Sequence, residues 1–495
     1  MNGRLPRLAG IGFLFLGVLQ AEEVQGRVLA AGQPLAGVRV HPDRPPRIAP
    51  ERPVPGTETD AEGRFRLVVE PSDAALVIEK RGFRRDLVPR GNWGSPLSLA
   101  PAPRFSEERV LVVRLDFAGA LSRRTDAQIR SLYFGRDPGA ATVANYFYEA
   151  SKGELLLAEG DLLHLTVPAD GPPPVESSKA ALARFVLSAL RGRPLGDLDR
   201  VDNATGAPRP DGRPDHLWIV LPGPPGSVTP DPAHLHPASL LVRPPGRSPR
   251  PWPLLLLTEE TPLGNVVHEA LHAMGEHRAG DLYGARSGPP KAGIWDLMDG
   301  GQYRGWDARH PETGPWVEDT GYSPSHPGPW VRTELWYRGR FAGTVPQLRV
   351  LGRRWEGWLD PIVRAPGGPP QRLTVADPRR AGAFWEFWVA RPWGFEAGRI
   401  GGRFGPGHEG LVVAHVDPRR PGGPVQVRDA HPGSARPGEP RLPGRGWELE
   451  DAAFNLGPGE QSAGRDGPLS WVVQGVDPSG RMNVQIMLQS PGRPR

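Results

Sequence analysis

The sequence of 495 residues contains no cysteine. Disulfide bonds are therefore excluded, and so is lipid attachment at an N-terminal cysteine. Any metal ion must be held by nitrogen and oxygen ligands from His, Asp or Glu. A chain of this length is too long for one hydrophobic core and usually divides into about two to four domains.

Lysine is also scarce, so that 56 of the 60 basic residues are arginine. These arginines are scattered among 55 acidic residues, and the formal net charge is only +5. A nucleic-acid-binding protein is expected to carry a concentrated basic stripe, which this distribution lacks. We therefore expect no nucleic-acid partner.

No apolar run is long enough to cross a membrane as a helix, which needs about 20 residues. The short run at residues 11–19 follows Arg4 and Arg7 and precedes a small residue, Ala21. This order is typical of a secretory signal peptide, which we assign to residues 1–21. We expect the protein to be secreted, into the extracellular space or the periplasm, without stable membrane insertion.

Residues 22–100 are predicted to form a small all-β sandwich. Apolar residues alternate with polar ones at 24–29 and 35–40, and Phe65, Leu67 and Val69 share one face of a further strand. The Asp and Gly residues of the turn at 59–63 serve turn chemistry in this interpretation. No catalysis is assigned to this part of the chain.

Two further domains are expected beyond a Pro/Ala-rich linker at residues 96–104. Residues 105–340 combine apolar runs with helical patterns and are predicted to form an α+β (α/β) domain. Its expected strands are 109–117, 216–221 and 254–257, and its expected helices are 141–153 and 177–190. Residues 345–490 are predicted to be β-rich, with strands at 384–389, 410–417, 469–473 and 482–487 and an exposed loop at 420–445.

The strongest chemical signal is the H-E-x-x-H pattern at His268, Glu269 and His272. On a helix, positions i and i+4 share a face, so two imidazoles can reach one Zn²⁺ at about 2.0–2.1 Å. The intervening glutamate lies beside the open coordination position, where it can act as general base towards water. The spacing therefore predicts a catalytic zinc site with Glu269 as catalytic residue.

Two downstream features extend the pattern. Gly275 stands where H-E-x-x-H-x-x-G proteins leave the helix and turn back with a third ligand. The segment 293–301 is predicted to form a Met-turn that carries Met298. The stretch H-E-A-L-H-A-M-G, then D-L-Y-G and G-I-W-D-L-M-D-G-G, resembles the immune inhibitor A-like family of secreted bacterial metallopeptidases. R-V-L-V-V-R-L-D-F and V-A-N-Y-F-Y-E-A-S-K-G-E-L resemble the same family upstream.

The resemblance covers roughly residues 105–420 and implies a zincin or metzincin-like catalytic domain with one catalytic zinc. Members of the family often bind calcium as well. Residues 22–100 resemble the carboxypeptidase regulatory-like β-sandwich domain of many exported proteins. The sequence departs from the family after Gly275, where three extra residues precede D-L-Y. Alignment on D-L-Y gives Asp281 as third ligand, with His277 as the alternative and Glu276 as a weaker one.

Other candidates are less specific. Tyr303 follows the Met-turn and could donate a hydrogen bond to an oxyanion, or simply pack. His415 either lines a cleft or is structural, and we favour the structural role; no metal role is assigned to His234 and His236. An oxygen-rich loop before residue 216 offers ligands suited to Ca²⁺, although nearby arginines favour a plain solvated loop equally. Its members are Asp199, Asp202, Asn203, Asp211 and Asp215.

These patterns favour a secreted zinc-dependent endopeptidase that acts on protein or peptide substrates. One alternative is an exported binding or adhesion protein whose protease domain is inactive, suggested by the insertion before Asp281. A second is a zinc hydrolase that acts on a non-peptide bond. No motif supports nucleotide binding or a serine nucleophile, and no oligomeric state is predicted.

Overall fold

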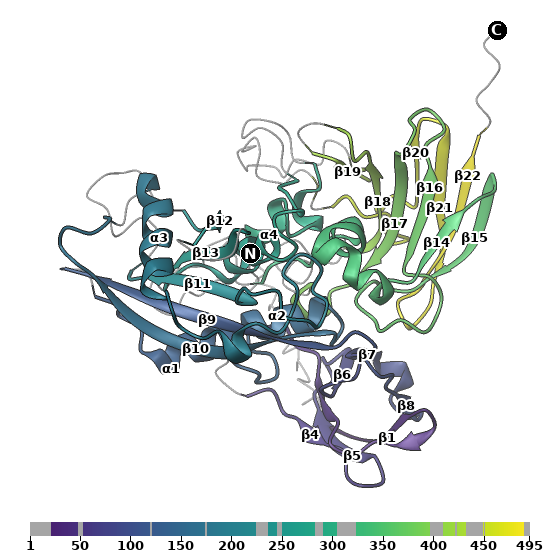
Figure 1. The fold of residues 1–495 in the computed structure, drawn as a ribbon. Helices are drawn as coiled ribbons and strands as arrows, with labels where there is room; N and C mark the ends of the chain where they lie inside the picture. The colour runs from purple at the N-terminus through teal and green to yellow at the C-terminus, as the bar shows by residue number, and fades with distance from the viewer. Residues whose placement is uncertain are drawn as a thin grey trace, which may run out of the picture.

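The computed structural model has a mixed α/β, multidomain fold with several sheets and few helices (Figure 1). Residues 1–20 of the predicted signal peptide lie outside the part of the chain that the structure describes. The described residues are 21–47, 53–118, 121–173, 176–223, 236–244, 250–282, 291–303, 323–396, 409–420, 423–431, 449 and 451–489.

The first eight strands form two small sheets, which we call the N-terminal sandwich. One sheet has the order β2-β1-β5 with β8 also on β1, and the other has the order β4-β3-β6-β7. The strands are β1 (Glu22–Ala30), β2 (Gln33–Pro34), β3 (Arg39–Pro42), β4 (Thr57–Glu58), β5 (Arg64–Val69), β6 (Ala75–Glu79), β7 (Asp86–Pro89) and β8 (Leu97–Ser98).

A single apolar core joins these two sheets. The predicted face of β5 is buried as expected, because Phe65, Leu67 and Val69 alternate with exposed residues. They pack with Val28 of β1 and with Ile78 of β6 in the opposite sheet. The period-two pattern of the sequence therefore corresponds to a strand with one face on the core and one face in water.

A five-stranded sheet of order β10-β9-β11-β13-β12 is formed by the middle part of the chain. Its first four strands are parallel, whereas β12 runs antiparallel to β13 at the edge. The strands are β9 (Ser106–Phe117), β10 (Leu155–Val167), β11 (His216–Leu221), β12 (Ala238–Val242) and β13 (Trp252–Thr258). The helices of this part, which we call the central domain, are α1 (Asp126–Phe134), α2 (Val143–Ala150), α3 (Lys179–Ala189) and α4 (Leu263–Ala273).

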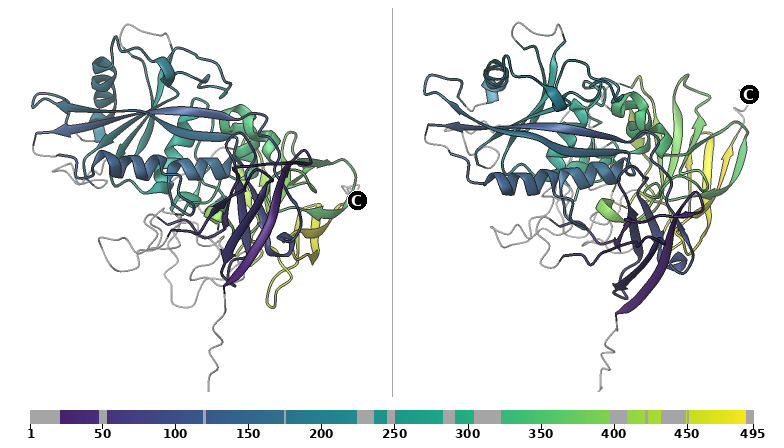
Figure 2. Two further views of the ribbon diagram at one scale, coloured as in Figure 1. Left: turned by 90° about the horizontal axis from the view of Figure 1, so that it is seen from below. Right: turned by 60° about the horizontal axis from the view of Figure 1, so that its bottom comes forward.

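Both faces of the central sheet are covered by helices, as Figure 2 shows for α3 on one side and for α1 and α2 on the other. Alternate residues of β9 divide between two cores. Val110 and Val112 pack with α1, α2 and α4. Leu111 and Val113 pack with α3. Burial on both faces explains why β9 and β11 are continuous apolar runs in the sequence.

Local sequence signals fix the ends of two of these helices. Thr125 and Gln128 form a reciprocal capping box at the start of α1. Thr142 accepts a hydrogen bond from the backbone N–H of Asn145 at the start of α2. After α2, Lys152 and Gly153 adopt positive φ angles of 56° and 83°. Gly153 is the predicted stop of that helix, because a left-handed residue cannot continue a right-handed helix.

The last nine strands form a second pair of sheets, the C-terminal sandwich. Their orders are β14-β16-β17-β18-β19 and β15-β22-β21-β20. The strands are β14 (Gln347–Val350), β15 (Arg354–Leu359), β16 (Arg372–Ala376), β17 (Phe384–Ala390), β18 (Gly410–Val416), β19 (Val425–Val427), β20 (Ala463–Asp466), β21 (Leu469–Val476) and β22 (Met482–Leu488). Short 3₁₀ and π turns complete the fold at η1 (Arg90–Asn92), η2 (Glu176–Ser178), η3 (Gly196–Leu198), η4 (Gly293–Trp295), η5 (Gly300–Tyr303), η6 (Val331–Leu335), η7 (Trp336–Thr344) and η8 (Gly394–Glu396).

The larger sheet of the C-terminal sandwich is buried on both faces. Phe387 of β17 and Val413 of β18 face the other sheet of the sandwich. Their neighbours Trp388 and Val412 pack instead into the core of the central domain. The C-terminal sandwich therefore supports the central domain directly.

The loop predicted at residues 420–445 is partly wrong. β19 lies within it, pairs antiparallel with β18, and buries Val425 and Val427. The residues that follow, 432–445, lie outside the described part of the chain. The Pro- and Gly-rich surroundings of a three-residue strand hide its alternation, which is why the sequence pattern favoured a loop.

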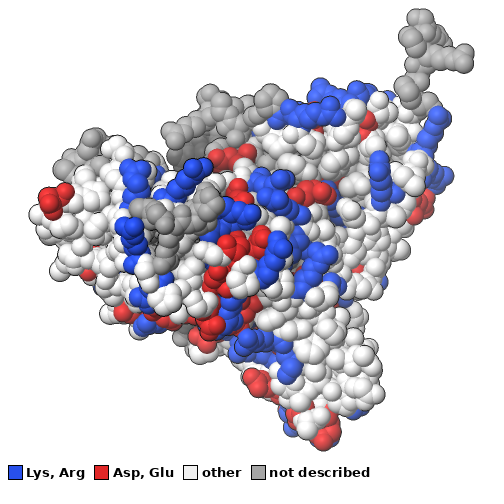
Figure 3. Space-filling model, in the orientation of Figure 1, with Lys and Arg blue, Asp and Glu red and all other residues white. Residues whose placement is uncertain are grey.

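Among the described residues, no helix has the length and apolar character needed to cross a membrane. On the face shown in Figure 3, basic and acidic side chains are interspersed.

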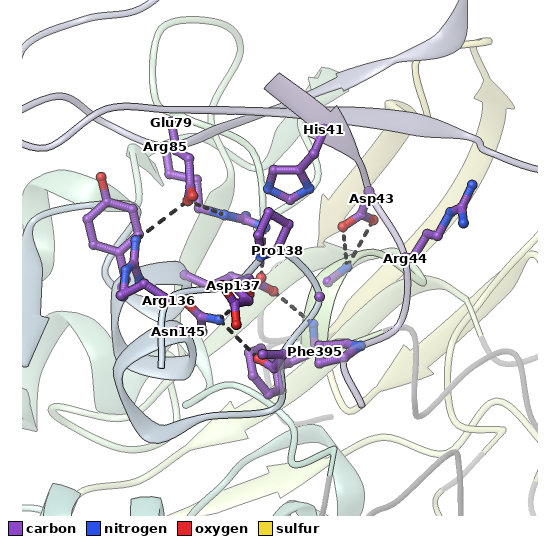
Figure 4. A pocket seen from close by; sticks show the side chains of 16 residues that line it. His41, Asp43, Arg44, Glu79, Arg85, Arg136, Asp137, Pro138, Asn145 and Phe395 are labelled. Atoms are coloured by element: carbon purple, nitrogen blue, oxygen red, sulfur yellow. Dashed lines mark hydrogen bonds and ion pairs between the residues drawn. The ribbon is translucent and has the colours of Figure 1, made fainter. Parts of the chain in front are cut away.

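The three parts of the molecule meet at a polar cavity of about 40 Å³, shown in Figure 4. Glu149 of α2 contacts all three. Its carboxylate lies 2.8 Å from the Arg85 guanidinium of the N-terminal sandwich. It also accepts a hydrogen bond of 2.8 Å from the backbone N–H of Phe395, which precedes the last strands of the C-terminal sandwich. Asp43 accepts from the neighbouring N–H of Gly394. The cavity is thus a structural junction of buried charges.

Candidate metal centre

The centre is built on α4, which follows β13 after a short turn. Val266, Val267, Ala270 and Leu271 bury the apolar side of this helix in the main core. Their spacing of one, three and four residues places them on one side of a helix. The histidines of the H-E-x-x-H pattern therefore share the side of α4 that faces away from the bulk of the core.

Three ligand atoms converge beside α4. His268 Nε2 and His272 Nε2 lie 3.0 Å apart. Asp281 Oδ1 lies 3.1 Å from each of them. Tetrahedral zinc with bonds of about 2.0–2.1 Å needs ligand atoms about 3.3 Å from one another. Among the described residues this is the one cluster with metal-holding geometry, and its donors fit Zn²⁺.

Backbone carbonyls orient both imidazoles. The Leu297 carbonyl lies 3.1 Å from Nδ1 of His268, and the Ala279 carbonyl lies 2.5 Å from Nδ1 of His272. A carbonyl can only accept, so each Nδ1 donates its proton and each Nε2 presents a lone pair to the centre. Both rings are therefore held in the tautomer that a metal requires.

The structure brings Asp281, the predicted third ligand, together with the two histidines. Burial alone would raise the pKa of Asp281, but the contacts of its carboxylate with the His268 and His272 imidazoles outweigh it and hold that pKa well below its usual value. The carboxylate is therefore ionised and ready to bind a cation. The structure does not bring the two alternatives into the cluster. His277 stacks on His272 with ring centroids 6.1 Å apart, and Glu276 pairs with Arg213 at 2.7 Å.

The three extra residues after α4 are accommodated by a left-handed turn. Gly275, Glu276 and His277 have φ angles of 85°, 58° and 61°. The N–H of His277 bonds back to the carbonyl of His272 at 2.8 Å, which closes the helix end. Each left-handed non-glycine residue costs about 1–2 kcal/mol, so neighbouring groups must hold this turn. The turn directs the following residues back to Asp281.

The predicted Met-turn is a tight turn whose apolar residues pack in the same core as the buried side of α4. Met298 is fully buried in it, and its N–H bonds to Asp296 Oδ1 at 2.9 Å. The carbonyl of Leu297 holds His268, while the carbonyl of Met298 accepts from the N–H of Leu282, next to Asp281. The turn therefore positions two of the three ligands through its backbone.

Glu269 lies between α4 and the edge strand β12. Its Oε2 accepts a hydrogen bond of 2.7 Å from the backbone N–H of Ser239. This contact fixes one carboxylate oxygen of Glu269. The sequence pattern pointed to Glu269 but not to the N–H of Ser239 that contacts it, because a backbone N–H leaves no signal in the residue pattern.

The structure does not place the other candidate residues in this centre. The backbone of Tyr303 ends η5, but its side chain lies outside the described part of the chain, as does His234. His236 is described and is not part of the metal-holding group. His415 is buried in β18 with Nε2 3.0 Å from Asp377, as expected of a structural polar group.

Most carboxylate oxygens of the loop considered for calcium have protein partners, although Oδ1 of Asp211 is buried without a hydrogen-bond partner among the described residues. Asp199 accepts from the N–H groups of Asp211 and Gly212, and Asp215 accepts from three backbone N–H groups. Asp202 pairs with Arg209 at 2.7 Å, and Asp211 pairs with Arg213. The guanidinium groups of Arg209 and Arg213 neutralise part of the negative charge that a bound Ca²⁺ would otherwise neutralise.

A pair of asparagine variants separates the two candidates for third ligand. Asp281→Asn is expected to weaken zinc binding by more than the roughly 10- to 100-fold that loss of an outer contact costs, because a neutral amide oxygen replaces a carboxylate that would bind the ion directly. His277→Asn is expected to leave it unchanged, since asparagine tolerates the left-handed conformation of that position. Competition with a chromophoric chelator measures both affinities. The assignment of Asp281 is wrong if the His277 variant shows the larger loss.

In comparisons with known proteins, no protein-family model and no curated protein matched the chain.

Proposed function

We propose that the protein is a zinc-dependent endopeptidase. One observation carries the proposal: His268, His272 and Asp281 converge within 3.1 Å of one another, with Glu269 next to the first of them. When bound, Zn²⁺ would polarise a carbonyl and acidify water, which are the requirements of metal-assisted hydrolysis. The resemblance to immune inhibitor A-like metallopeptidases belongs to the same proposal.

The residues of the chain have distinct roles in this reaction. His268, His272 and Asp281 bind the ion. Glu269 accepts a proton from the attacking water and returns it to the leaving amine, which keeps the proton count balanced. The N–H of Ser239 orients the Glu269 carboxylate during both steps.

The edge strand β12 supports a peptide as substrate. In the described part of the chain, β12 pairs on one side only, with β13. An exposed strand edge binds an extended peptide through backbone hydrogen bonds. Since Ser239 of this strand contacts Glu269, a peptide along β12 would pass beside the general base. This arrangement favours peptide hydrolysis over the rival hydrolysis of a non-peptide bond.

The alternative of an inactive binding protein was motivated by the insertion before Asp281. The reach of Asp281 into the cluster, despite that insertion, supports the active enzyme instead.

Metal analysis and proteolysis together test the proposal. We expect one zinc ion per purified chain and cleavage of casein that stops with 1,10-phenanthroline and resumes when zinc is restored. A zinc-free protein that leaves casein intact would support the binding protein. Zinc binding with turnover of esters or amides other than peptides would support the second rival.

A further inference from the structure

Arg213 links the oxygen-rich loop to the segment that carries the third ligand. Its side chain is 0% exposed, and its guanidinium reaches two carboxylates from distant parts of the sequence. It lies 2.7 Å from Glu276 Oε1, and its Nε donates to Asp211 Oδ2 at 3.0 Å. It also donates to the carbonyl of Pro251, just before β13, at 3.0 Å. The planar guanidinium group of arginine has enough N–H donors to contact all three groups at once.

A second link runs in parallel with the first. The N–H of Gly275 donates to the carbonyl of Asn203 at 3.0 Å, and the N–H of Asn203 donates to Asp211 Oδ2 at 3.0 Å. Asp211 therefore accepts hydrogen bonds from both Arg213 and Asn203, the two residues that contact the end of α4. The two links hold Gly275 and Glu276, which are the first two residues of the left-handed turn.

We propose that Arg213 is a positioning residue of the candidate zinc centre. It holds Glu276 in its left-handed conformation, so that the chain five residues later brings Asp281 to the two histidines. This inference rests on the proposed function, since it concerns the same centre.

Loss of the contact between Arg213 and Glu276 should lower the fraction of molecules that can bind zinc. If the segment 275–281 lost this contact, it would spend part of its time with Asp281 away from the histidines. The apparent dissociation constant for zinc rises in proportion as the binding-competent fraction falls. Saturating zinc selects the competent conformation again, so catalysis by the loaded enzyme should be preserved. A residue that only stabilised the fold would not produce this separation.

The test uses Glu276→Gln in the full chain, because this residue is partly exposed and Arg213 keeps its contacts with Asp211 and the Pro251 carbonyl. We expect zinc to bind about tenfold more weakly, the lower end of the effect of losing an outer contact of a metal site. The zinc affinity should fall at temperatures well below the thermal midpoint of the metal-free variant, and kcat/KM at saturating zinc should stay at its wild-type value. Arg213→Lys should weaken zinc binding similarly, and the two changes together should not be additive.

Arg209→Gln is the matched control. Arg209 pairs with Asp202 in the same loop, is 69% exposed, and makes no described contact with residues 275–281. Its variant should bind zinc as the wild type does. If wild-type protein and Glu276→Gln bind zinc equally well, the positioning role is overturned while the proposed function stands. If the wild-type chain binds no zinc at all, both are overturned.

Discussion

Replacing Glu269 with glutamine is expected to lower kcat/KM for a peptide substrate by about 10²- to 10⁴-fold, the usual contribution of a general base. Glutamine has the same shape, and its amide oxygen can still accept from the Ser239 N–H that now bonds to the carboxylate at 2.7 Å. It cannot accept the proton of the attacking water. Because Glu269 is not one of the three converging ligands, zinc content should stay at one ion per chain.

A fluorogenic peptide assay and elemental analysis on the same preparation measure both quantities. Glu260→Gln is a suitable control, since it removes a carboxylate just before α4 and outside the ligand group. A Glu269 variant with wild-type turnover would eliminate the mechanism. A variant that lost its zinc would show instead that Glu269 helps to hold the ion.

The helix of the candidate centre was predictable from the sequence because one periodicity governs both its burial and its chemistry. Val266, Val267, Ala270 and Leu271 recur at helical spacing, and the same spacing places His268 and His272 on one side. The strands of the central sheet were predictable for a similar reason. Burial on both faces leaves long apolar runs such as β9 and β11, which stand out from their surroundings.

The path to Asp281 was not predictable in the same way. The turn after α4 uses Glu276 and His277 at positive φ, where sequence patterns favour glycine or asparagine. It is held by Arg213 and Asn203, which lie more than fifty residues earlier in the chain. Contacts between distant segments have no period in the sequence, so the resemblance favoured Asp281 without explaining how it reaches the histidines.

The same limit applies to the groups that support the ligands. Leu297, Ala279 and Ser239 act through backbone carbonyl or N–H groups, which every non-proline residue possesses. Only the fold decides which of these groups faces the centre. The turn at Met298 was predicted from its place after the H-E-x-x-H-x-x-G pattern and from the family resemblance, but the bond of the Leu297 carbonyl to His268 was not predicted.

The junction of buried charges in Figure 4 is connected to the centre through residues beyond the cavity. Glu149 contacts Arg85 of the N-terminal sandwich and the N–H of Phe395. It also lies 3.3 Å from His326, whose carbonyl accepts from the N–H of Leu297 in the Met-turn. A chain of short contacts therefore joins the N-terminal sandwich to the turn that holds His268. Stability at this junction should be a condition for a well-formed centre.

Glu149→Gln is expected to lower the free energy of unfolding by about 3 kcal/mol at neutral pH, as when one partner of a buried ion pair is removed. The amide loses the charge that faces Arg85 and must turn a donor towards either Arg85 or the Phe395 N–H. Equilibrium urea denaturation measures the change. The exposed pair of Glu62 and Arg64 provides the control, because Glu62→Gln should change stability little.

The effect of this substitution should depend on pH in a definite direction. Burial alone would raise the pKa of Glu149, but Arg85, His326 and the Phe395 N–H outweigh it and lower the pKa from 4.5 to about 2. A lowered carboxyl pKa stabilises the folded state above the unfolded pKa and ceases to do so as pH falls through the folded one. The difference between wild type and variant should therefore be complete above about pH 4.5 and shrink towards pH 2. A difference that stayed constant over this range would mean that the charge of Glu149 does not hold the junction together.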